Sequence, residues 1–226
     1  MNESLRMYHR IDNKTHPNLS EKEKISLYIN SFKEPAKSII EQIKHKDYSC
    51  VLGVDASGRV PALIVGSFLG KEIFFDFPYS GNEINFNNIT PGKKVLVIDD
   101  TLYGGTSILE VTRQSRKKNI PFDVGIFMSV NKTAEDIERY RVALEADKIF
   151  VGYDHTFIDA FDADTESQIT ETEIVKRKDI SGVKRVGEYP EKRQVVLDKG
   201  NLNQEDFNFG REEIKRLASE LGQEIT

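Results

Sequence analysis

Short apolar runs alternate with amphipathic segments through the middle of the chain. The apolar runs predict strands at residues 50–54, 72–77, 94–98, 123–129 and 148–153. Helical spacing of apolar residues between these runs predicts helices at residues 60–69, 107–118 and 133–144. This alternation is typical of an α/β protein, and we expect a mostly parallel sheet with helices on both faces.

Both ends of the chain carry helical patterns without strands. Ser20 and Glu23 form a capping box that begins one helix, and a second helix follows Pro35. After an acidic stretch and a segment bearing Lys and Arg, a last amphipathic helix is expected near residues 209–221. We therefore expect three parts: an N-terminal helical segment that packs on the core (1–45), the core itself (46–160) and a C-terminal appendage (161–226).

Composition narrows the class of protein. The 226 residues include 32 basic and 37 acidic side chains, a formal net charge of -5, so no overall field draws the protein to nucleic acid or to an anionic membrane. Cys50 is the single cysteine, which excludes an internal disulfide and fits a small buried residue in a reducing compartment. The polar N-terminus and the lack of a long apolar stretch favour a cytoplasmic protein.

The strongest chemical signal follows the strand predicted at residues 94–98. Two carboxylates, Asp99 and Asp100, come first, and a short spacer then leads to Gly104, Gly105, Thr106 and Ser107. Glycines permit positive φ and a close approach of backbone N–H groups to an anion, and the hydroxyls add donors while capping the next helix. Carboxylates suit a sugar diol or Mg²⁺. The segment predicts a ligand with a phosphate, a ribose and a metal ion, although solvated aspartates beside an ordinary glycine turn are the alternative.

Residues 94–107 (KVLVIDDTLYGGTS) resemble the signature with which type I phosphoribosyltransferases bind 5-phosphoribosyl-1-diphosphate, PRPP. The resemblance implies that Asp99 and Asp100 hold the ribose diol and the metal ion. It also implies a 5-phosphate site made of Tyr103, Gly104, Gly105, Thr106 and Ser107. With the aspartates in register, Gly104 stands where the family has a leading Thr, and a shift by one residue places Tyr103 there instead.

Two further segments strengthen the resemblance. The diphosphate loop of the family is similar to Asp55, Ala56, Ser57, Gly58 and Arg59, for which a plain turn between strand and helix is the alternative. Residues 147–153 (DKIFVGY) resemble the strand beside the nucleobase, which implies base contacts from Phe150, Val151 and Tyr153; a strand without a ligand role is the alternative. Residues 78–82 lie where the family has a mobile loop.

The resemblance implies a transferase that moves ribose 5-phosphate from PRPP to a nitrogenous base and releases diphosphate. Mg²⁺ is the implied cofactor, a small-molecule base the second substrate, and a homodimer the implied assembly. Tyr103 stands where 6-oxopurine enzymes carry an acid, which disfavours a 6-oxopurine acceptor. A catalytically weak or inactive PRPP- or nucleotide-binding regulator on the same fold is the main alternative. A receiver-like signalling domain is disfavoured because the acid pair follows the third strand, not the first.

Overall fold

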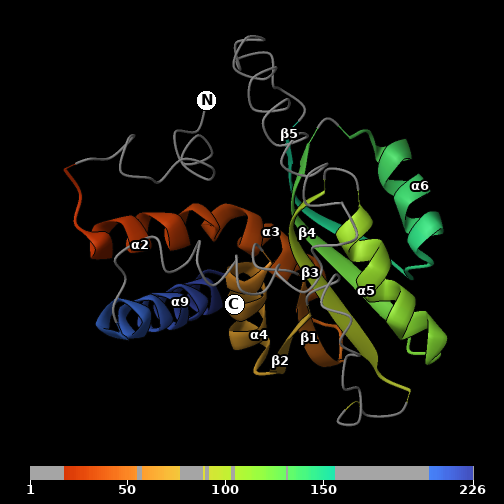
Figure 1. Cartoon of the computed structure of the whole chain (residues 1–226), viewed down its shortest axis with the longest axis horizontal. Helices are drawn as coiled ribbons and strands as arrows, with labels where there is room; N and C mark the ends of the chain where they lie inside the picture. Colours follow the sequence, from red (N-terminus) through yellow and green to blue (C-terminus); the bar gives the residue numbers. More distant parts are fainter. Residues whose placement is uncertain are drawn as a thin grey trace, which may run out of the picture.

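A five-stranded sheet forms the centre of the protein in a computed structural model (Figure 1). The structure describes residues 18–54, 58–76, 89, 92–102, 105–130, 132–155 and 204–225. The strand order is β2-β1-β3-β4-β5, and all neighbouring strands are parallel. The strands are β1 (Tyr48–Val54), β2 (Glu72–Asp76), β3 (Lys94–Leu102), β4 (Phe122–Val130) and β5 (Ile149–His155). The predicted α/β class and parallel sheet are confirmed.

Helices cover the sheet on both faces. They are α2 (Glu21–Ser31), α3 (Lys33–Ile43), α4 (Arg59–Leu69), α5 (Thr106–Lys117), α6 (Ala134–Leu144) and α9 (Gln204–Ile225). Figure 1 shows α5 and α6 on one side of the sheet and α2, α3, α4 and α9 on the other. None of these helices is both long enough and apolar enough to span a bilayer within the described ranges.

Two hydrophobic clusters sandwich the sheet because successive strand residues face opposite sides. In β3, Leu96 and Ile98 belong to the first cluster, beneath α3, α4 and α9, whereas Val95 and Val97 belong to the second, beneath α5. Burial on both faces explains why the strands read as continuous apolar runs. Cys50 is a buried free thiol in the second cluster, as the sequence predicted.

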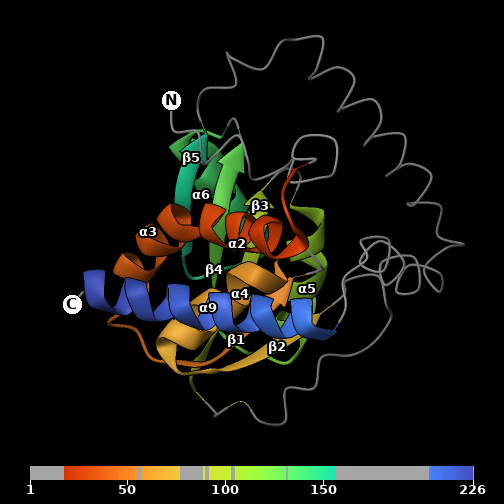
Figure 2. The ribbon, with the colours of Figure 1, turned by 90° about the vertical axis from the view of Figure 1, so that its left-hand side faces the viewer.

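The C-terminal helix α9 packs beside α2 and α4, which Figures 1 and 2 both show. Leu217 and Leu221 of α9 are fully buried in the first cluster. At the surface, Lys33 Nζ lies 2.7 Å from a carboxylate oxygen of Glu224. The helix predicted near residues 209–221 therefore exists, is longer than expected, and shares a core with the N-terminal helices.

The strand order reverses direction between β1 and β3. The chain leaves β1 through α4 to reach β2 on one side, and it later enters β3 on the other side of β1. Connections that diverge in this way open a crevice beyond the carboxyl ends of the two strands, where ligands of doubly wound sheets bind. The topology therefore selects the ends of β1 and β3 as the place to look for a site.

A buried polar cluster lies at the other end of the strands from this crevice, where β1, β3 and β4 begin. Asp123 of β4 is inaccessible to solvent, and its carboxylate accepts hydrogen bonds from Tyr48 Oη at 2.8 Å and Lys94 Nζ at 3.2 Å. Lys94 Nζ also lies 2.7 Å from Asp147 Oδ2. Burial, together with the hydrogen bond to Asp123, raises the pKa of Tyr48. The cluster joins the beginnings of β1, β3 and β4.

We predict that Asp123→Asn lowers the free energy of unfolding by about 1.5–3 kcal/mol, because a buried hydrogen bond between charged groups is lost. Asp147→Asn is the matched control: it touches the same lysine, but the Asp147 side chain is 49% exposed, so we expect a loss below about 1 kcal/mol. Urea denaturation of the two variants measures the difference. Equal losses of unfolding free energy in the two variants would contradict a larger contribution from the buried carboxylate of Asp123.

Candidate functional site

Gly58 closes the turn between β1 and α4 directly above the reversal of strand order. Its N–H donates to Val54 O at 3.0 Å, and its own carbonyl accepts from Ala62 N at 3.0 Å. A Cβ added at Gly58 would lie 2.4 Å from Val54 O and 2.8 Å from Ile98 O. Only glycine fits at position 58, because its Cα lies against the backbones of both β1 and β3. Gly58, one of the two described residues of the predicted diphosphate loop, thus lies at the crevice.

Strand β3 extends beyond its pairing with β1. The register between them ends at Gly53 and Ile98, while β4 continues to pair with β3 as far as Leu102. Asp99 and Asp100 therefore lie inside β3, not after it as the sequence predicted. The apolar run stops at Ile98, but the backbone of β4 still supplies hydrogen-bonding partners, so the strand goes on. Both acids stand at the reversal point, one strand away from Gly58.

The two carboxylates have different environments. Asp99 is 6% exposed, and its Oδ1 accepts a hydrogen bond from the N–H of Asp100 at 2.9 Å, whereas Asp100 is only partly buried. Consecutive residues of a strand direct their side chains to opposite faces. The next residue, Thr101, has a buried Oγ1 without a hydrogen-bond partner among the described residues. Acceptors and a donor thus gather at this end of β3.

The turn between β3 and α5 contains Gly105 in the left-handed region, with a φ of 70°. This confirms the predicted need for a positive φ. Gly105 is also the N-cap of α5 and makes no side-chain capping hydrogen bond. Capping by Thr106 or Ser107 was predicted and is wrong, because both residues lie in the first turn of the helix. The N–H groups of that turn have no partners within the helix and are suited to an anion.

Arg59 lies next to Gly58, at the beginning of α4. It is the first residue of α4, and its guanidinium carbon lies 5.8 Å from the centre of the Phe75 ring. Burial lowers the pKa of Arg59, but a guanidinium stays charged at neutral pH. The predicted cation of the loop is therefore held at the sheet edge next to Gly58, where it adds positive charge to the end of the helix.

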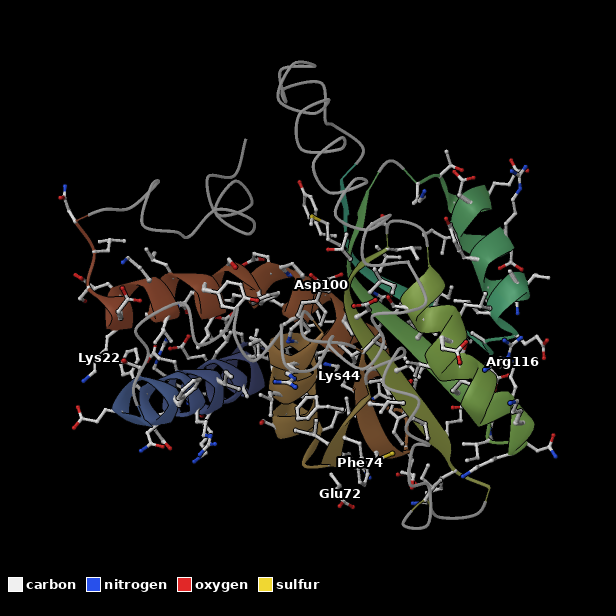
Figure 3. The ribbon with its side chains drawn as sticks, in the orientation of Figure 1. Lys22, Lys44, Glu72, Phe74, Asp100 and Arg116 are labelled. Carbon is white, nitrogen blue, oxygen red and sulfur yellow. The ribbon has the colours of Figure 1, made fainter. Side chains whose placement is uncertain are left out.

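Tyr28 of α2 is a site residue that sequence reasoning missed. Burial and, second, the negative charge of Asp100 raise the pKa of Tyr28 to about 12. Figure 3 shows Asp100 on the side of β3 that faces α2 and α3. In the sequence, Tyr28 follows the apolar spacing of α2 and is therefore indistinguishable from a core residue. In the structure its ring packs edge-on against Phe32. Only the packing of α2 reveals that it lies near the acid.

Tyr140 lies against the turn at Gly105, and Lys132 lies over the ring of Tyr140. The sequence predicted neither contact. A Cβ added at Gly105 would lie 3.0 Å from Cε1 of Tyr140, so the ring of this α6 residue rests against the turn. Lys132 Nζ lies 5.5 Å from the centre of the same ring. No sequence signal links α6 to the glycine turn, because the contact arises from the packing of α6 beside α5.

The predicted base-binding residues separate in the structure. Phe150 is the second residue of β5, far along the strand from its carboxyl end, and is 6% exposed in the first cluster. The structure therefore does not bring Phe150 to the candidate site, because strand alternation turns its ring beneath α3. Val151 is half-buried, and its carbonyl accepts from Gln42 Nε2 of α3 at 3.3 Å. Tyr153, near the carboxyl end and 37% exposed, is the member of this set best placed for a ligand.

Several predicted residues lie outside the described part of the chain. They are Asp55, Ala56, Ser57, Tyr103 and Gly104, together with the side chain of Thr106 and the expected mobile loop at residues 78–82. Within the described ranges, no three His, Cys, Asp or Glu residues form a group able to hold a metal ion. Asp99 and Asp100 are therefore suited to Mg²⁺ only if a ligand and water complete its oxygen shell.

Two solved structures are similar to part of this chain. A hypothetical protein from Neisseria gonorrhoeae, solved with bound ppGpp, aligns over 55% of this chain and 79% of its own, with a TM-score of 0.42 and 14% identity. Adenine phosphoribosyltransferase from Saccharomyces cerevisiae, solved with adenine and an imino-altritol bisphosphate, aligns over 56% of this chain and 79% of its own, with a TM-score of 0.45 and 16% identity. At these TM-scores neither structure indicates the ligand of this chain. No protein-family model and no curated protein matches it.

We predict that Asp100→Asn lowers the pKa of Tyr28 from its value of about 12, while burial keeps it above 10. The folded protein holds this proton more tightly than the unfolded chain, so the stabilisation is complete below pH 10 and is lost as the pH rises toward 12. The variant should therefore lose its tyrosine proton at lower pH. A pH titration of ζ-¹³C-labelled tyrosine by NMR measures the shift.

Asp99→Asn is the matched control, since Asp99 is not among the causes of the Tyr28 shift. An equal change in the pKa of Tyr28 in both variants would contradict the placement of α2 beside Asp100.

Proposed function

We propose that this protein binds PRPP with Mg²⁺ at the carboxyl ends of β1 and β3 and transfers its phosphoribosyl group to a nitrogenous base, with release of diphosphate. One observation carries the proposal: helices α4 and α5 begin at Gly58 and Gly105, at the same end of the sheet as the carboxylates Asp99 and Asp100 and at the reversal of strand order, and the first N–H groups of a helix suit an anion. A ligand with an anion at each end and a diol between them matches this arrangement.

Each end of the site is assigned to one part of PRPP. The turn at Gly105 leads into the open first turn of α5 and suits the 5-phosphate, whose oxygens accept hydrogen bonds from backbone N–H groups. The turn at Gly58, with Arg59 beside it, suits the diphosphate, which needs more positive charge. Asp99 and Asp100 repel phosphate, but their oxygens accept hydrogen bonds from the ribose hydroxyls.

The transfer replaces one bond at the anomeric carbon by another. The bond from this carbon to a diphosphate oxygen breaks, the bond to a base nitrogen forms, and the nitrogen releases its proton to solvent. Positive charge develops on the ribose ring during this exchange, and Asp99 and Asp100 stabilise it while they orient the ring. Backbone N–H groups of the first turns of α4 and α5 hold the phosphates in place. Bound Mg²⁺ would neutralise charge on the leaving diphosphate.

A regulatory protein that binds PRPP without turnover is the second candidate, favoured by the altered phosphate loop. Gly104 stands where the family signature has a leading Thr, so the loop carries one hydroxyl fewer. An assay of diphosphate release with adenine, guanine, hypoxanthine, uracil and orotate separates the two functions. Release with one base supports the transferase; binding of Mg-PRPP without release from any base supports the regulator.

We predict that Asp99→Asn combined with Asp100→Asn weakens Mg-PRPP binding by at least about tenfold and abolishes diphosphate release, because hydrogen bonds between charged acceptors and the diol are lost. Isothermal titration and the release assay measure the two effects. Asp147→Asn is the control, since it removes an acid at the opposite end of the sheet. Unchanged binding in the double variant would refute the proposed site.

We predict that Gly105→Ala weakens the binding of ribose 5-phosphate, because its Cβ strains the backbone and pushes on Tyr140. Gly70→Ala is the matched control: Gly70 has a similar φ of 61° but nothing within 4 Å of an added Cβ. Both variants should lose about 1–2 kcal/mol of stability from the left-handed conformation. Only Gly105→Ala should lose affinity, and equal affinities in the two variants would argue against a phosphate at this turn.

A further inference from the structure

Phe75 near the end of β2 is a large apolar side chain that the core does not use. It is 39% exposed and belongs to neither hydrophobic cluster. Its neighbours differ in this respect, since Ile73 packs against the first cluster and Phe74 against the second. The hydrophobic core therefore does not account for the position of this ring.

The ring leans across the end of β1. Phe75 pairs with Gly53 in the parallel register, and a Cβ added at Gly53 would lie 2.9 Å from Cδ1 of Phe75 and 2.9 Å from Cβ of Ala62. The missing side chain at Gly53 is therefore what lets the ring of Phe75 and the helix α4 meet over β1. This brings the ring from the outer strand β2 toward the turn that Gly58 closes.

Arg59 lies over this ring, with 5.8 Å between its guanidinium carbon and the ring centre. A cation at the first position of a helix is opposed by the helix dipole, and α4 has neither an acidic residue in its first turn nor a side-chain cap. The face of the ring attracts the cation and lowers this cost. It also restricts the rotamers of a long side chain, so that less entropy is lost when an anion binds.

We infer that Phe75 is a positioning residue that holds Arg59 toward the diphosphate end of the ligand. The inference rests on the proposed function for the identity of the whole ligand. It adds that the strength and selectivity of the diphosphate subsite depend on an aromatic side chain of the neighbouring strand. The 5-phosphate end, which relies on the Gly105 turn, does not depend on this pair.

Phe75→Leu tests the inference with three probes: Mg-PRPP, Mg-diphosphate and ribose 5-phosphate. We expect the Kd for the first two to rise about threefold to fivefold, because without the ring an entropy loss of roughly 0.6–1 kcal/mol for ordering the Arg59 side chain falls on the binding step. The Kd for ribose 5-phosphate should stay unchanged. Phe75→Tyr, which keeps the ring, should bind all three probes as the wild type does.

A double-mutant cycle shows whether Phe75 acts through Arg59. In an Arg59→Gln background, Phe75→Leu should cause no further loss of Mg-diphosphate affinity. Phe74→Leu is the matched control, because it makes the same change one residue away on the opposite face of β2 and should leave the affinities unaltered. If Phe75→Leu does not fold, as judged by circular dichroism, Phe75→Met replaces it, since it keeps the apolar volume without the ring.

The outcomes for the inference and for the proposed function differ. Equal affinities of Phe75→Leu and the wild type for Mg-diphosphate, or the same loss in both backgrounds of the cycle, would overturn the inference alone. Binding of Mg-diphosphate that depends on Phe75, without any binding of Mg-PRPP, would overturn the proposed function and leave the inference standing. Failure of the wild type to bind any probe would overturn both.

Discussion

Strand β3 runs past the end of β1 because β4 continues to hydrogen-bond with it, and the candidate site depends on this overhang. Ile98 is the last residue of β3 in register with β1, whereas Leu102 is still paired with Ser129 of β4. The overhang places Asp99 and Asp100 on ordered backbone above the end of a shorter strand. Acids on a mobile loop would lack this fixed geometry, which any role in orienting a sugar requires.

Glycines determine how closely the loops approach the overhang. At Gly58 the constraint is space, since the carbonyls of Val54 and Ile98 occupy the room that a side chain would need. At Gly105 it is also conformation, because the chain turns through a positive φ before α5 begins. The two glycines are the N-caps of α4 and α5, so both helices begin at this end of the sheet. The first N–H groups of a helix have no partners within the helix, and they are the donors that this end of the sheet can offer.

Two cations at this end of the sheet lie over aromatic rings. Arg59 lies over Phe75, and Lys132 lies over Tyr140, which itself touches the turn at Gly105. Carboxylates elsewhere, such as Asp123 at the other end, are neutralised by direct contact with lysine and tyrosine. The two ends of the sheet therefore hold their charged side chains by different kinds of contact.

The sequence alone predicted the α/β class, the five strands, the order of helices and strands, and a glycine with positive φ at Gly105. These follow from local patterns: apolar runs, helical spacing and glycines next to polar side chains. The length of β3 depends on its hydrogen bonds to β4, and the pattern of apolar residues in β3 gives no sign of them. The sequence could not show that α2 brings Tyr28 to Asp100, that Phe75 crosses Gly53 to reach Arg59, or that Phe150 turns into the core. These contacts join residues far apart in the chain, and only the packing of helices and strands against one another decides them.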